Sequence, residues 1–159
     1  MVAEKDIYTL RMAKKKNDYT IVKLAQTRDS YEGSEVPGEF RRFTDQLNTE
    51  QLAITLIRIP AHSDFEQSTG HYHDEIEELY IIAKGTLTMR FGNDIKKVSA
   101  GSVVRVAPKT PRSHRNETDQ PVEMWAISPK LGRDDSHLIK AFWQASKKAV
   151  QKRKRPFKL

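Results

Sequence analysis

The chain has 159 residues, enough for one domain with a buried core, and no cysteine, which excludes disulfides, thiolate metal sites and cysteine nucleophiles. Its net charge of +7 is concentrated at one end, because residues 136–159 hold eight Lys or Arg and no acid, so the remainder carries 20 − 21 = −1. No apolar run approaches the roughly 20 residues that span a bilayer, and residues 1–10 lack the apolar segment of a signal peptide. We therefore expect a cytoplasmic protein.

Short strands separated by turns account for most of the predicted structure up to residue 130. β-Branched and aromatic residues, often in period-two alternation, mark these strands. We expect them at residues 19–24, 52–59, 71–73, 78–83, 86–91, 95–98, 103–106 and 122–127, with a shorter one at 40–43. Pro60 stops one strand, Gly85 turns the chain after another, and residues 92–94 close a hairpin.

The spacing of apolar residues changes near the end of the chain. Leu138, Ile139, Phe142 and Trp143 recur at helical spacing after Ser136, a suitable N-cap. We therefore predict a helix from Ser136 to about residue 150, with its apolar face on the sheets. Short strands punctuated by Gly and Pro, followed by one terminal helix, predict an all-β fold, either an antiparallel barrel or a jelly roll.

The segment around residues 71–78 is the strongest candidate site. His71 and His73 are two positions apart, and such residues point to the same face of a strand, so both imidazoles can reach one ion. Four acidic residues follow within five positions, and Glu77 and Glu78 compete for the role of a carboxylate ligand. His114, in a later turn-rich segment, is a third candidate histidine.

Two motifs in the chain resemble those of the cupin superfamily. His71-Tyr72-His73, then Glu78 and Gly85, keep the spacing of the first cupin motif, and the segment from Gly101 through Pro108 to His114 and Asn116 is similar to the second. The second motif departs from the family pattern: its first part is one residue longer, and Thr110 stands where a glycine is usual.

The resemblance covers roughly residues 50–128 and implies a cupin-type double-stranded β-helix, to which the helical spacing after Ser136 adds a C-terminal α-helix. We therefore divide the chain into an N-terminal extension with one or two added strands (1–48), a barrel core (49–130), and a C-terminal helix with a basic tail (131–159).

The resemblance also implies a metal site formed by His71, His73, Glu78 and His114. Glu78 is preferred to Glu77 because its position matches the motif. Three imidazoles and a carboxylate suit a divalent transition ion such as Fe, Mn, Ni or Zn. The alternative is a cupin barrel that has kept these residues without a catalytic ion.

Two function classes remain open at this level. The first is a metal-dependent enzyme (a dioxygenase, isomerase, or decarboxylase or other lyase) acting on a small oxygen-containing molecule, with Tyr80 and His62 as weak candidates for proton transfer. The second is a non-catalytic cupin that binds a small ligand or has a regulatory role. We expect a homodimer. Residues 152–155 are all basic, but without interleaved aromatic residues a solvated terminus is favoured over nucleic-acid binding.

Overall fold

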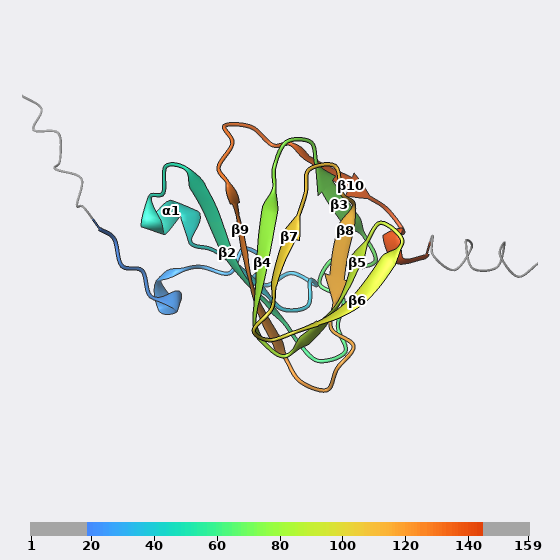
Figure 1. Ribbon diagram of the computed structural model, residues 1–159. Helices are drawn as coiled ribbons and strands as arrows, with labels where there is room; N and C mark the ends of the chain where they lie inside the picture. The colour runs from blue at the N-terminus through green and yellow to red at the C-terminus, as the bar shows by residue number, and fades with distance from the viewer. Residues whose placement is uncertain (1–18, 145–159) are drawn as a thin grey trace, which may run out of the picture.

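The computed structural model describes residues 19–144, which form two antiparallel five-stranded sheets (Figure 1). The first sheet has the order β1 (Glu39–Arg42), β2 (Leu52–Ile59), β9 (Val122–Pro129), β4 (Glu78–Lys84), β7 (Val103–Val106). The second has the order β10 (Ser136–Ile139), β3 (Gly70–His73), β8 (Arg112–Arg115), β5 (Thr86–Phe91), β6 (Asp94–Ser99). A 3-10 turn η1 (Leu24–Gln26) and a short helix α1 (Thr44–Leu47) precede β2. This architecture confirms the predicted all-β jelly roll.

The hydrophobic core lies between the two sheets. Period-two alternation turns Ile57 and Ile59 of β2 inward, and Ile57 pairs in register with Met124 of β9, which is fully buried. Ile82 of β4 and Met89 of β5 close the core from the two sheets. Ile57 and Ile59 thus share the inward face of β2, whereas β5 is buried at four consecutive positions, from Leu87 to Arg90.

The prediction of a strand over residues 19–24 is wrong. Residues 19–22 are extended without a sheet partner, and Leu24–Gln26 form η1. Tyr19 and Ile21 are 75% and 77% exposed, so the alternating apolar residues find no surface to cover. Propensity alone does not form a strand when no partner strand is present.

Two strands were not predicted, and one of them replaces the start of the predicted helix. Strand β8 reads RSHR and carries no local strand signal. Strand β10 begins at Ser136, which is therefore not a helix N-cap, and it pairs antiparallel with β3. Pairing with an otherwise exposed strand edge outweighs the helical spacing of residues 138–143.

Helical conformation begins only at residue 142, and residues 145–150 of the predicted helix lie outside the described part. Phe142 and Trp143 do pack on the body, at 5% and 6% exposure. Arg90 lies 4.3 Å from the centre of the Phe142 ring, and the Trp143 indole donates a hydrogen bond to Ser113 Oγ at 2.8 Å. These contacts fix the chain immediately after β10.

The motif glycine Gly85 turns the chain between β4 and β5 in a left-handed conformation (φ +79°). A Cβ here would lie 2.7 Å from the carbonyl oxygen of Pro121 and 2.8 Å from a methyl group of Val122. The turn therefore needs glycine for its φ angle and for close packing. Within residues 19–144 no helix has the length and apolar character needed to cross a membrane.

Candidate metal centre

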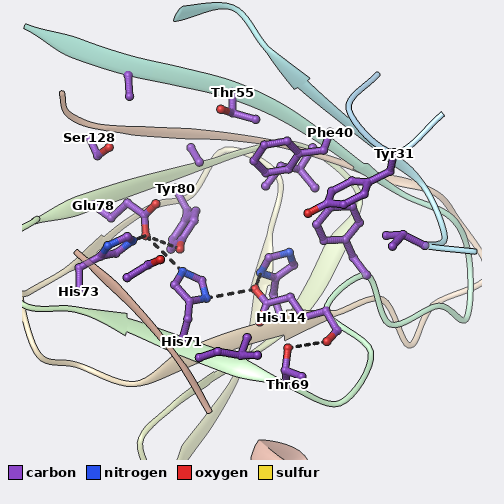
Figure 2. A pocket seen from close by; sticks show the side chains of 18 of the residues that line it. Tyr31, Phe40, Thr55, Thr69, His71, His73, Glu78, Tyr80, His114 and Ser128 are labelled. Atoms are coloured by element: carbon purple, nitrogen blue, oxygen red, sulfur yellow. Dashed lines mark hydrogen bonds and ion pairs between the residues drawn. The ribbon is translucent and has the colours of Figure 1, made fainter. Parts of the chain in front are cut away.

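Two histidines and a glutamate converge between the sheets. His71 and His73 project from β3, and Glu78 projects from the facing sheet at the start of β4, so residues 74–77 carry the chain across the gap (Figure 2). One ligand atom from each of the three residues lies within 4.8 Å of the others. Nε2 of His71 and Nε2 of His73 are each 4.0 Å from Glu78 Oε2. This spacing brings two nitrogens and one oxygen around a common point.

Asp135 orients His73 toward that point. Its Oδ1 lies 2.7 Å from His73 Nδ1, and its Oδ2 accepts the backbone N–H groups of Glu75 at 2.9 Å and Ile76 at 3.2 Å. Burial acts to raise the pKa of Asp135, but these donors outweigh it and hold the pKa below its usual value. Because an ionised carboxylate only accepts hydrogen bonds, His73 donates through Nδ1 and presents the lone pair of Nε2.

Glu78 is fixed by Tyr80 and Arg112. The Tyr80 hydroxyl donates to Glu78 Oε2 at 2.5 Å, and the Arg112 guanidinium forms an ion pair with the same oxygen. Burial acts to raise the pKa of Glu78, but Arg112 and Tyr80 lower it below its usual value; burial and the Glu78 charge raise the pKa of Tyr80 well above its usual value. Glu78 is therefore a carboxylate and Tyr80 a neutral phenol.

His114 lies on the other side of His71 and is outside the three-residue cluster (Figure 2). Its Nδ1 is 3.1 Å from Glu66 Oε1, an ion-pair distance without hydrogen-bond alignment, and neither ring nitrogen has a hydrogen-bond partner among residues 19–144. Glu66 Oε1 is also 3.7 Å from His71 Nδ1. Burial acts to raise the pKa of Glu66, but His114 and His71 bring it down to about 2.

The charges of the site suit a divalent cation. With neutral imidazoles, the carboxylates of Glu66, Glu78 and Asp135 contribute −3 and the Arg112 guanidinium +1, which sums to −2. All four side chains are at most 13% exposed, so solvent does little to screen this imbalance. Two imidazole nitrogens and a carboxylate oxygen are also donors that borderline ions prefer. The residues present therefore fit the metal that the sequence implies.

A cavity of about 640 Å³ contains the site. All four predicted ligands line it, as do Tyr80 and Glu66. His62 is not among the lining residues: it has a positive φ of 51°, is largely exposed and pairs with Asp119 at 2.5 Å. Of the two candidates for proton transfer, the structure thus brings only Tyr80 to the cavity.

Glu77, the competitor of Glu78, is directed elsewhere. Its side chain is 47% exposed and forms an ion pair with Arg105, whereas that of Glu78 is 13% exposed and lines the cavity. Adjacent residues of an extended chain point in opposite directions, which accounts for the difference.

Sequence reasoning missed three residues of the site: Glu66, Arg112 and Asp135. Neither Glu66 nor Arg112 lies in a predicted strand or at a position of the two motifs, so no sequence pattern selects them. Asp135 is 62 residues from His73, so no local spacing links the two. Asp135 immediately precedes the segment that pairs with β3, so a prediction of this pairing would have placed Asp135 near His73. The sequence analysis predicts a helix there instead, so this signal was missed.

The fold and the site indicate the class of protein: a small jelly roll of two facing sheets, with a His/His/Glu cluster between them that could hold a metal ion. Residues 58–128 match the family model of the cupin domain. This match supports the resemblance to the cupin superfamily, and a single cupin domain fits the described fold. No curated protein matches the chain closely enough to count as a relative.

Solved structures of cupins superpose on the chain at low sequence identity. A cupin protein from Bacteroides fragilis has a TM-score of 0.59 and 21% identity, covering 75% of this chain and 90% of its own. A sugar phosphate isomerase of the cupin superfamily from Silicibacter pomeroyi has a TM-score of 0.60 and 20% identity, covering 70% and 76%. A DMSP lyase from Ruegeria pomeroyi has a TM-score of 0.54 and 16% identity, covering 79% and 73%. At these identities the likeness concerns the fold.

Proposed function

We propose that the protein binds a divalent transition ion through His71, His73 and Glu78, with His114 as a fourth ligand, and acts on a small oxygen-containing molecule in the adjoining cavity. The observation that carries the proposal is the convergence of three donor atoms in a largely buried site that holds three carboxylates and one guanidinium. His114 is included because it lines the same cavity and its ring nitrogens lack hydrogen-bond partners among residues 19–144.

The residues of the chain divide the work in this proposal. Asp135 fixes the tautomer of His73, and Arg112 and Tyr80 keep Glu78 ionised and in place beside the cavity that would hold the substrate. A bound ion would supply Lewis-acid polarisation of a substrate oxygen. Dioxygenase, isomerase and lyase reactions all use this polarisation. The isomerase and the lyase among the solved structures are examples of such activities on the same fold.

Elemental analysis of protein purified without a metal-affinity tag tests the proposal. We expect about one equivalent of metal, or uptake of one equivalent on addition of Mn, Fe, Ni or Zn. The double variant His71→Ala/His73→Ala should lose this uptake and keep the circular-dichroism spectrum of a β protein. Wild-type protein that neither contains nor takes up a stoichiometric ion would refute the metal site.

A non-catalytic cupin that binds a small ligand is the second candidate. Tyr80 favours it, because the hydroxyl nearest the cluster is already committed to Glu78 and its raised pKa makes it a poor proton donor. Oxygen consumption and product formation by the metal-loaded protein, with sugars, diketones and thiols as substrates, separate the two. The homodimer stays a prediction, which light scattering on the purified protein can check.

A further inference from the structure

The cavity has two chemically different ends. One end holds the His71, His73 and Glu78 cluster. The other is a wall of three aromatic rings, Tyr31, Phe40 and Phe65, which all line the cavity. Figure 2 shows Tyr31 and Phe40 on the side of the cavity away from His73 and Glu78. Phe40 and Phe65 are stacked with centroids 6.0 Å apart, and Tyr31 meets each of them edge-on, at 5.8 and 5.7 Å. The rings pack on one another, so they form a continuous apolar surface rather than an open cage around a cation.

Aliphatic residues extend this surface, and Phe65 also stacks on His114 with centroids 6.1 Å apart. The aliphatic lining residues are Val36, Ala53, Ile57, Ala126 and Leu138. Tyr31 is 39% and Leu138 67% exposed, so both lie where the cavity meets solvent. A molecule that enters past them meets this apolar surface together with polar side chains such as those of Thr55 and Ser128.

Within the described chain, the cavity offers no Lys or Arg side chain to an anionic group. Among the lining residues of the described chain there is neither Lys nor Arg, whereas Glu66 and Glu78 both line it. Arg112, next to Glu78, is only 1% exposed and is engaged by Glu78 and Tyr80. A phosphate in this cavity would therefore lose its hydration near two carboxylates, with only the ion as a counter-charge.

From this lining we infer the substrate class: a compact molecule with an oxygen-bearing head that reaches the ion and a flat apolar or aromatic body that lies on the Tyr31, Phe40 and Phe65 wall, without a phosphate group. The inference rests on the proposed metal function. A cavity of about 640 Å³ is in the range of sites that enclose small organic ligands. The substrate class therefore differs from that named by the sugar phosphate isomerase of the same fold.

Two hydroxamates with the same metal-binding group test the inference. Acetohydroxamate carries a methyl group and benzohydroxamate a phenyl ring, and both are titrated calorimetrically into Zn-loaded protein whose metal content has been measured. We expect benzohydroxamate to bind about tenfold more tightly or better, because its ring is buried on the aromatic wall. A hexose 6-phosphate, titrated in parallel, should bind more weakly than either.

Variants assign the preference to the wall. In Phe40→Ala, and in the milder Phe40→Leu, the ratio of the two hydroxamate affinities should fall by about threefold or more, with metal content unchanged. Phe43→Ala is the matched control, because Phe43 is buried against Trp125 (centroids 5.2 Å apart) and does not line the cavity. In Phe43→Ala the ratio of the two hydroxamate affinities should equal that of the wild type.

The outcomes separate this inference from the function on which it rests. Metal-loaded protein that binds both hydroxamates equally, or the hexose 6-phosphate more tightly, would overturn the substrate class and leave the metal site standing. A ratio that falls equally in the Phe40 and Phe43 variants would also overturn it. Protein that takes up no metal and binds neither hydroxamate would overturn the proposed function together with the substrate class.

Discussion

Replacing Asp135 with Asn should weaken metal binding without removing any ligand. The Asp135 side chain is 3% exposed and serves two partners, with Oδ1 on His73 and Oδ2 on the backbone N–H groups of Glu75 and Ile76. An amide has only one acceptor oxygen. If that oxygen takes the two N–H groups, the NH₂ group faces His73 Nδ1 and favours the tautomer with the proton on Nε2, the atom that faces Glu78 Oε2 at 4.0 Å.

The expected loss follows from what such supporting carboxylates contribute in metal sites. Removing one lowers metal affinity by about 10- to 100-fold, which corresponds to about 1.4 to 2.7 kcal/mol. Exchanging a charged acceptor for a neutral one should also lower the free energy of unfolding of the metal-free protein by about 1 to 2 kcal/mol. For a chain of this length the melting temperature would fall by only a few degrees, so the protein stays folded for the measurement.

A competition titration with a metal-sensitive dye measures the affinity of Asp135→Asn against the wild type. Asp119→Asn is the control, because Asp119 also pairs with a histidine, His62, at 2.5 Å, but on the surface and away from the cavity. We expect the control to bind metal like the wild type. An Asp135→Asn protein whose affinity lies within twofold of the wild type would show that Asp135 does not orient a ligand.

Three further predictions concern the same site and its frame. His114→Ala should lower metal affinity in the dye titration by tenfold or more; an unchanged value would remove His114 from the ligand set. Arg112→Met leaves the buried Glu78 carboxylate without its ion-pair partner, so the free energy of unfolding, measured by thermal unfolding, should fall by about 3 to 5 kcal/mol. Adding Glu78→Gln to the same chain should restore part of this loss. Gly85→Ala should lower the free energy of unfolding, measured by chemical denaturation, by about 1 to 3 kcal/mol, because the new Cβ meets the Pro121 carbonyl. An unchanged free energy of unfolding would contradict the packing described.

The fold could be predicted where local patterns and final contacts agree. Strand β2 is rich in apolar and β-branched residues over eight positions and ends before Pro60, so its composition, length and boundary all point the same way. Residues 19–24 have the same strand-forming character but lack a partner. Residues 136–139 have helical spacing, yet they pair with β3. Both errors arise because a strand depends on a neighbour that may be distant in sequence.

The candidate site likewise contains residues that the sequence predicts and residues that it does not. His71 and His73 share a strand face, so their spacing alone predicts that both imidazoles reach one point. Residue spacing left Glu77 and Glu78 as alternatives, and the resemblance selected Glu78, which lies with the two histidines in the structure. Glu66 and Asp135 act through contacts made by loops, whose paths no residue spacing specifies. Their roles became visible only once the distances were known.

The irregular second motif has a structural consequence on strand β8. Arg112 and His114 both face the interior and Ser113 faces Trp143, because alternate residues of a strand share a face. Arg112 is level with His71 across the sheet and occupies the inward position next to Glu78, so His114 lies two residues further on, beside Glu66. Arg112 thus pairs with Glu78, and His114 pairs with Glu66. The second carboxylate, Glu66, offsets the positive charge that Arg112 adds to the site as a whole. Glu66 and Arg112 should therefore be considered together with the ligands of the proposed metal site.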